Sequence, residues 1–138
     1  MADASEKLTF ELVSPERLLV SEEVEMVVVP GREGDFGVLP QHSPLISTVR
    51  PGVIDIYRDG KIEKRIFVAG GFAEVNLEGC TVLAEEALGL DEIDRAGAEE
   101  RLRHAETCLK DAVDDAERAA AEHNIEIATL LLDALAQG

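Results

Sequence analysis

The sequence predicts an α+β protein in which an N-terminal antiparallel β-sandwich of about ten short strands is followed by a C-terminal αα-hairpin. Two observations support this prediction. All five prolines lie between Pro15 and Pro51, and most glycines precede residue 90. Apolar residues alternate with polar ones before that point, whereas after it they recur at steps of three and four. We therefore expect two domains, residues 1–87 and residues 88–138.

Short strands with one buried face are expected throughout the first domain. Segments such as Leu8–Leu12 and Val75–Leu77 have apolar residues at every second position, which places those side chains on one face of a strand. Asp59-Gly60 and Glu78-Gly79 can adopt positive φ angles, so each pair is predicted to close a two-residue hairpin. Many short strands with this spacing are typical of a sandwich.

Two helices are expected in the second domain. Small and apolar residues follow one another at steps of four and three between Ala98 and Ala116. Asp91 and Asp94 offer N-cap oxygens, so we expect the first helix to begin within a residue or two of Asp91. His123-Asn124 is predicted to separate it from a second, shorter helix. Because alanine dominates the first helix's contact face, little area is buried, and the hairpin is expected to be weakly held and mobile.

Composition excludes several classes of function. The net charge is −16 and aromatic residues make up 4% of the chain, which argues against binding to nucleic acid. The chain opens without a signal segment and its apolar stretches are far shorter than a membrane span, so a soluble cytoplasmic protein is expected. Cys80 and Cys108 lie in different kinds of structure and are expected to be reduced packing residues.

Several segments resemble the epsilon subunits of bacterial F-type ATP synthases, in the order found in that family. The longest is VPGREGDFGVLPQHSPL at 29–45, and the others are VRPGV at 49–53, VAGGFAEV at 68–75 and the opening FELVSPE at 10–16. The resemblance covers the first domain and, by architecture, the helical tail. It implies a sandwich at the foot of the central stalk, between the gamma subunit and the membrane rotor ring, that works by mechanical coupling.

The resemblance also implies which residues meet these partners. It places Asp35 at the acidic position facing the ring and His42 near both the gamma and the ring contacts, although Gln41 stands where the family usually has glycine. From the residues themselves, the glycines from Gly31 to Gly37 are expected to interrupt the strand ladder and expose the charged residues between them. The expected ring interface is Glu33, Asp35 and His42, and the expected gamma interface is Ser14, His42 and Ser47.

The tail of bacterial relatives can extend along gamma into the catalytic head and block ATP hydrolysis, and some relatives bind ATP at the start of the first helix. Here three residues separate Asp91 from Arg95, which turns the arginine about 100° beyond the place that the family's ATP motif requires. The two are therefore weak nucleotide-binding candidates, and the alternative is an i,i+4 helix pair. Since no lysine or arginine follows Arg118, we expect weak or absent inhibition.

No nucleophile–base pair or metal motif is recognisable in the sequence, so we expect no catalytic residue, metal or cofactor. The expected partners are gamma, the c-subunit ring and, if the tail extends, the beta subunit. The expected location is peripheral, on the cytoplasmic side of the bacterial inner membrane. The alternative is a free-standing β-sandwich binding module with a helical dimerisation tail. The position of the hairpin, ATP binding and the choice of proton or sodium as driving ion stay open.

Overall fold

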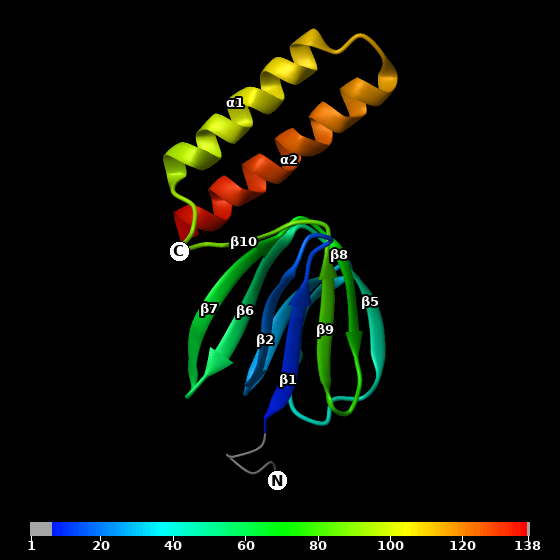
Figure 1. The fold of residues 1–138 in the computed structure, drawn as a ribbon, viewed down its shortest axis with the longest axis vertical. Helices are drawn as coiled ribbons and strands as arrows, with labels where there is room; N and C mark the ends of the chain where they lie inside the picture. The colour runs from blue at the N-terminus through cyan, green and yellow to red at the C-terminus, as the bar shows by residue number, and fades with distance from the viewer. Residues whose placement is uncertain (1–6, 138) are drawn as a thin grey trace. The chain divides into compact units, whose positions relative to one another are not determined.

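A computed structural model describes residues 7–137 (Figure 1). The chain divides into two compact units, with the boundary between Gly89 and Leu90. The first unit consists of strands and the second of two helices, so the predicted α+β class with a sandwich and a helical hairpin is confirmed.

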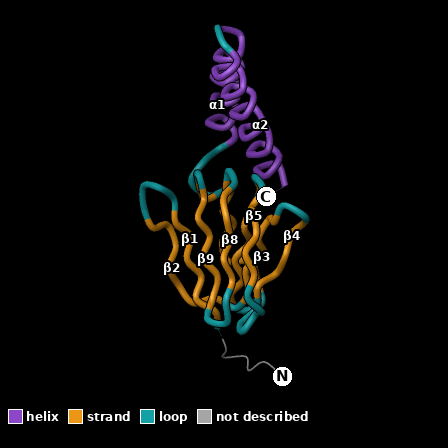
Figure 2. Tube along the Cα trace, turned by 90° about the vertical axis from the view of Figure 1, so that its right-hand side faces the viewer, coloured by secondary structure: helices purple, strands orange, loops and turns teal. Residues whose placement is uncertain are grey.

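Ten strands form one sheet that curves into a sandwich (Figures 1 and 2). The strand order is β10-β7-β6-β3-β5-β8-β9-β1-β2, and β4 pairs with β3. All pairs are antiparallel except β1 and β9, which are parallel, so the sheet is mixed and not purely antiparallel as predicted. The strands are β1 (Leu8–Val13), β2 (Leu18–Val24), β3 (Met26–Gly31), β4 (Gly34–Val38), β5 (Leu45–Val49), β6 (Gly52–Arg58), β7 (Lys61–Val68), β8 (Gly71–Val75), β9 (Gly79–Ala84) and β10 (Ala87–Gly89).

The chain bends between β5 and β6, at Arg50-Pro51, and β3 pairs with both strands. Gly31 is opposite Val49 in β5, and Val28 is opposite Asp55 in β6. Proline lacks a backbone N–H and is suited to a position between two strands. One short strand thus joins the two parts of the curved sheet.

The hairpin turns test the sequence predictions directly. Asp59 and Gly60 connect β6 to β7 with φ angles of 55° and 75°, as predicted for a two-residue turn. The Glu25 carboxylate accepts the Gly60 N–H at 2.9 Å, and this bond lowers the pKa of Glu25. The predicted Glu78-Gly79 turn is wrong in detail. Three residues connect β8 to β9, because the Asn76 side-chain oxygen accepts the N–H groups of Glu78 and Gly79 at 2.8 and 3.0 Å.

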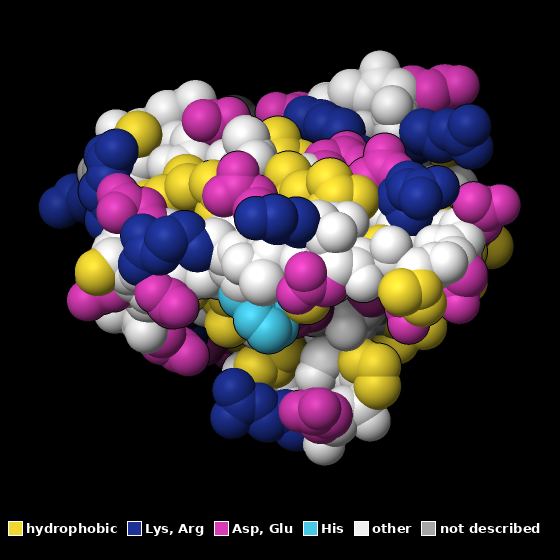
Figure 3. All heavy atoms as spheres, turned by 90° about the horizontal axis from the view of Figure 1, so that it is seen from above, with side chains coloured by type: hydrophobic (Ala, Val, Ile, Leu, Met, Phe, Trp, Pro, Cys, Tyr) yellow, Lys and Arg dark blue, Asp and Glu magenta, His cyan; other side chains and the backbone are white. Residues whose placement is uncertain are grey.

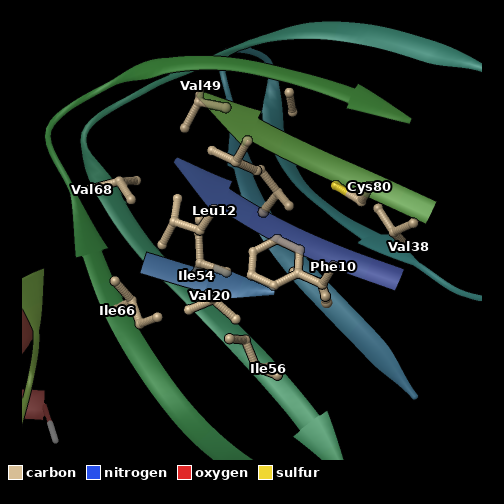
Figure 4. Packing of buried hydrophobic residues seen from close by; sticks show 14 of the residues in the cluster. Phe10, Leu12, Val20, Val38, Val49, Ile54, Ile56, Ile66, Val68 and Cys80 are labelled. Carbon is tan, nitrogen blue, oxygen red and sulfur yellow. The ribbon is translucent and has the colours of Figure 1, made fainter. Parts of the chain in front are cut away.

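The sandwich core consists of large apolar side chains contributed by almost every strand. Phe10 and Leu12 of β1 face Ile54 and Ile56 of β6, with Cys80 of β9 beside them (Figure 4). Burial raises the pKa of the Cys80 thiol to about 12. Within residues 7–137 no polar or charged residue is buried, so the core is held by apolar burial, at roughly 1.5–3 kcal/mol for each large side chain.

The first helix, α1 (Arg95–Asp111), begins later than predicted. Asp94 is its N-cap, and its carboxylate accepts the Gly97 N–H at 2.8 Å. Asp91 lies in the turn before the helix. Of the two aspartates proposed as caps, the later one therefore sets the start of the helix.

The second helix, α2 (Asp115–Gln137), shows that the predicted break at His123-Asn124 is wrong. Those two residues lie within α2, and the chain reverses at residues 112–114. The Asp114 carboxylate accepts the Glu117 N–H at 2.7 Å, and the Glu117 carboxylate accepts the Val113 N–H at 2.8 Å. This reciprocal capping fixes the start of α2, so the apolar series expected on one helix is divided between two.

Alanine dominates the buried positions of the hairpin, as predicted, although α2 also buries two large side chains. Cys108 is exposed, so its predicted packing role is wrong. Neither helix described between residues 7 and 137 is long and apolar enough to cross a membrane. The buried residues are Ala98 and Ala105 of α1, and Ala121, Ile127, Ala128, Leu131 and Ala134 of α2.

Candidate partner-binding surfaces

The turn between β3 and β4 exposes adjacent opposite charges. Arg32 and Glu33 form the turn and are exposed, and Asp35 is exposed in β4. A Cβ atom at Gly31 would lie 2.8 Å from both the Gly34 carbonyl oxygen and the Phe36 ring, and Gly34 has a φ of 136°. Only glycine fits these two positions without strain.

The third glycine of the series, Gly37, lies within β4 opposite Val28. Gly31 and Gly34 pair with each other at the ends of β3 and β4, so the prediction that these three glycines interrupt the ladder is wrong. The exposed charges predicted for this segment are confirmed, with Arg32 and Glu33 on the turn itself.

Arg50, at the bend between β5 and β6, contacts both ends of this turn through its side chain. Its Nη1 donates to the Gly31 carbonyl oxygen and its Nη2 to Asp35 Oδ1, both at 2.6 Å. Sequence reasoning gave Arg50 no role, although it lies in one of the segments that carry the family resemblance. Its pairing with Asp35 depends on strand register, which a single sequence does not show.

The loop between β4 and β5 contains the predicted His42. Gln41 has a φ of 64°, a conformation that glycine adopts more easily, so the loop keeps a backbone suited to the family's usual glycine. The His42 N–H donates to the Leu39 carbonyl oxygen at 3.2 Å, and ring atom Nδ1 lies 2.6 Å from the Ser43 carbonyl oxygen, which it contacts as a donor. The structure does not bring His42 into a hydrogen bond or ion pair with Asp35, within residues 7–137.

The two predicted serines make local hydrogen bonds. Ser14, between β1 and β2, donates to the Arg17 carbonyl oxygen at 3.4 Å. Ser47 donates to the Thr48 carbonyl oxygen at 3.0 Å and is half-buried, on the same face of β5 as buried Val49. Ser14 also borders a groove of about 420 Å³ lined by Pro15, Glu16, Arg17, Leu19, Glu85, Glu86, Ala87 and Leu88.

An exposed apolar row crosses the outer face of the sheet, and sequence reasoning missed it. Thr48 of β5 pairs with Phe72 of β8, then Leu83 of β9, Val13 of β1 and Leu18 of β2. Phe72, Leu83 and Leu18 are 60%, 55% and 56% exposed. We call these five residues the outer row. A partial signal was present, since β8 and β9 each carry an apolar residue, Phe72 or Leu83, on the face that also carries Glu74 or Thr81.

The weak nucleotide candidates do not form a pair. Asp91 lies before α1, whereas Arg95 donates to Glu99 at 2.8 Å, so the alternative of an Asp91–Arg95 helix pair is wrong. Asp91, Glu92 and Asp94, with Ile93, line a hollow of about 390 Å³. These carboxylates would repel a phosphate group. Across residues 7–137 no cluster of three or more His, Cys, Asp or Glu side chains could hold a metal ion.

Acidic and basic side chains are interspersed over the face seen in the space-filling view (Figure 3). The net charge of −16 is therefore not concentrated in one patch on that face.

Comparison with known proteins identifies the family. Residues 7–89 match the family described as ATP synthase, Delta/Epsilon chain, beta-sandwich domain. The chain belongs to this family. The ATP synthase epsilon chain of Rhodospirillum rubrum is 57% identical over 134 residues, which cover 97% of this chain and 98% of the relative. That of Paramagnetospirillum magneticum is 54% identical over 132 residues, covering 96% and 99%.

Solved structures agree with the family assignment. A chain in the structure of Euglena gracilis mitochondrial ATP synthase, described as OSCP/F1/c-ring, matches with a TM-score of 0.77 and 27% identity, covering 97% of this chain and 84% of that one. A chain of the Tetrahymena thermophila mitochondrial ATP synthase central stalk and c-ring matches with a TM-score of 0.65 and 13% identity, which shows a shared fold. The similarity to these relatives therefore extends over both the sandwich and the helical hairpin of this family member.

Proposed function

We propose that the chain is a non-catalytic rotor subunit of an F-type ATP synthase, which joins gamma to the c-subunit ring and so couples proton flow to ATP synthesis. Its place is peripheral, on the cytoplasmic side of the bacterial inner membrane. Similarity to epsilon chains over nearly the whole length supports the proposal. The observation that carries it is the outer row, an exposed apolar strip suited to a permanent partner.

The outer row is suited to gamma because of its composition and its surroundings. Contiguous exposed apolar surface on a soluble domain is typical of a protein interface. The neighbouring row on the same face begins with Ile46 of β5, which is 75% exposed, and continues through Glu74 of β8, Thr81 of β9 and Glu11 of β1. Ile46 extends the apolar surface, and the polar residues beyond it resemble the rim of a protein interface. Ser14 follows Val13 and so adjoins the row, whereas Ser47, which precedes Thr48, lies on the opposite face of β5.

A binding measurement with purified gamma tests this surface. Phe72→Glu should weaken binding at least tenfold, because association would bury a charge without a partner. Ile62→Glu is the matched control, since Ile62 is an exposed apolar residue of β7, outside the row. Equal affinity of the two variants would contradict the gamma surface. Failure of the unmodified chain to bind gamma would favour the free-standing binding module.

We expect the helical tail to inhibit ATP hydrolysis weakly or not at all. No lysine or arginine follows Arg118, and Glu122, Glu126 and Asp133 lie along α2. Approach to an acidic segment of the beta subunit would bring like charges together and disfavour an extended tail.

The rate of ATP hydrolysis by the catalytic head tests whether the tail inhibits. This rate should be similar when the head is combined with the full chain and when it is combined with a truncation ending at Leu88. Strong inhibition by the full chain that the truncation relieves would overturn the charge argument. A head without either protein gives the reference rate, and gamma binding by both forms shows that each has been incorporated.

A further inference from the structure

We infer that Asp59-Gly60 is the site at which this chain forms isoaspartate, and that Glu25 protects the site by holding the Gly60 nitrogen. This modification is independent of the proposed function, because none of the three residues belongs to the outer row or to the β3–β4 turn. The sequence contains one Asp-Gly pair and no Asn-Gly pair. Glycine has no side chain to hinder its backbone nitrogen, so this peptide is the most reactive of its kind in the chain.

The reaction needs only water and the atoms of the turn. The Gly60 nitrogen attacks the carbon of the protonated Asp59 side-chain carboxyl. A C–N bond forms, the nitrogen loses its proton, and the carboxyl OH leaves with a proton as water. A second water then opens the resulting succinimide at either carbonyl. Opening at the main-chain carbonyl gives isoaspartate, in which the chain continues through the Asp59 side chain and is longer by one methylene.

Neighbouring side chains do not shield this peptide from water. Asp59 and Gly60 are both exposed. A Cβ atom added at Gly60 would lie more than 4 Å from every heavy atom of residues 7–137 outside the adjoining residues. Any protection therefore comes from the conformation of the turn and from the hydrogen bond that fixes it.

The backbone conformation keeps the nitrogen away from the carboxyl group. The φ angles of Asp59 and Gly60 are 55° and 75°, as in a type I′ turn, where ψ of the first central residue is about 30°. At such a ψ the Gly60 nitrogen lies almost opposite the Asp59 Cβ atom about the Cα–C bond. Ring closure requires the two atoms to lie on the same side of that bond, so the turn must open before the succinimide can form.

Glu25, between β2 and β3, holds the turn closed. Its N–H donates to the Tyr57 carbonyl oxygen at 3.1 Å, just before the turn. Its carboxylate accepts the Gly60 N–H at 2.9 Å, so the anchored atom is the nucleophile itself. This hydrogen bond is the largest cause of the lowered pKa of Glu25, and the acceptor is therefore an ionised carboxylate at neutral pH. A negative charge beside the N–H also disfavours loss of its proton.

The experiment compares isoaspartate formation in the full-length chain and its variants during incubation at neutral pH. Isoaspartate is counted with a protein isoaspartyl methyltransferase as reagent and located by mass spectrometry of peptides. Glu25→Ala should form it severalfold faster than the unmodified chain, because the Gly60 N–H loses its acceptor. Glu25→Gln keeps an acceptor oxygen without the charge and should give an intermediate rate. A synthetic peptide of residues 55–64, which lacks Glu25, should react faster than the unmodified chain.

Glu63→Gln is the matched control for loss of one negative charge from the same hairpin. Glu63 lies in β7 and pairs with Arg58 Nε at 2.8 Å, whereas the Gly60 N–H is accepted by Glu25. This variant should form isoaspartate at the rate of the unmodified chain. Hydrogen exchange of the Gly60 amide should be faster in Glu25→Ala while the core strands stay protected, which separates opening of the turn from unfolding. If Glu25→Ala does not fold, Glu25→Gln and the peptide provide the comparison.

Several results would overturn the inference. Formation in the unmodified chain as fast as in the peptide would show that the turn is not protected. Isoaspartate that appears first at another residue in the Glu25 variants would show that Asp59-Gly60 is not the reactive site. Equal rates in the Glu25 variants and the unmodified chain would show that Glu25 has no protecting role. Slower formation in both Glu25 variants would show that the carboxylate acts as a base that promotes the reaction.

Discussion

The sandwich and the helical hairpin bury different kinds of side chain. The sandwich core contains Phe10, Leu12, Ile54 and Ile56, brought together from strands far apart in the sequence. The hairpin buries mostly alanine, with Ile127 and Leu131 as its large members. Apolar stabilisation follows buried area, so the sandwich should unfold as one cooperative unit while the hairpin opens at lower free energy.

The largest expected effect tests this comparison in the sandwich. Phe10→Ala should lower the free energy of unfolding by about 3–5 kcal/mol, because it leaves a cavity in the middle of the core. Urea denaturation followed by a β-sheet signal measures the loss.

Leu131→Ala should instead increase hydrogen exchange in α1 and α2 and leave the sandwich amides protected. Loss of protection in both units in Leu131→Ala would show that they unfold together.

The next test compares how readily a reagent in solution reaches the thiols of the two cysteines. Cys108 is exposed, whereas Cys80 is 2% exposed and its pKa is raised to about 12. A maleimide at neutral pH should therefore add one label, at Cys108, and the Cys108→Ser variant should stay unlabelled until urea unfolds the sandwich. Mass spectrometry counts the labels. Rapid labelling of Cys80 in the native protein would show that the sandwich opens far more readily than its core suggests.

The raised pKa of Cys80 also predicts how stability depends on pH. The unfolded chain releases this thiol proton near pH 9, whereas the folded chain keeps it until about pH 12. Over that interval the folded state binds more protons, so stability falls as pH rises. A Cys80→Ala variant should be less stable at neutral pH and should lose less stability between pH 9 and 11. Parallel curves for the two proteins would contradict this.

A smaller effect is expected at the start of α2. Asp114→Ala should destabilise the hairpin by about 1 kcal/mol, because it removes the acceptor of the Glu117 N–H. Helical circular dichroism during heating measures the change. Asp111→Ala is the matched control, since Asp111 is exposed at the carboxyl end of α1, where a negative charge is unfavourable. That variant should not lower hairpin stability.

The smallest effect is expected in the loop before His42. Gln41→Gly should change the free energy of unfolding by no more than about 1 kcal/mol, since relief of the positive φ is offset by greater freedom of the unfolded chain. Thermal unfolding measures it. Gln41→Val should destabilise the protein, because a β-branched residue is strained at this φ. Equal melting temperatures for all three proteins would show that the loop is too mobile to impose the conformation.

Local chemistry explains which parts of the fold were predictable. Asp59-Gly60 supplied both positive φ angles of its turn, and the alternation of the strands was correct. The break between the helices was missed although a signal was present. Asp114 and Glu117 have the spacing of a capping box, whereas His123-Asn124 attracted attention through low helix propensity, which tertiary packing overrides.

The candidate surfaces were less predictable, because they depend on register. The exposed charges of the β3–β4 turn followed from its glycines. The contact between Arg50 and Asp35 joins residues from separate strands, and the outer row requires the pairing of β5, β8, β9, β1 and β2 to be known. A one-residue shift in any of these pairings would move the row to the other face, and no single-sequence pattern determines it.

The pairing of β3 with both β5 and β6 has a mechanical consequence for the rotor subunit that we propose. A force applied at the β3–β4 turn along the direction of β3 is carried into both strands, which lie on either side of the bend at Arg50-Pro51. Hydrogen bonds loaded along the strand direction must break together, whereas those at a free edge can open one after another. The turn is therefore attached to the sandwich by a stiff joint, and elastic compliance under load should reside in the side chains at its tip.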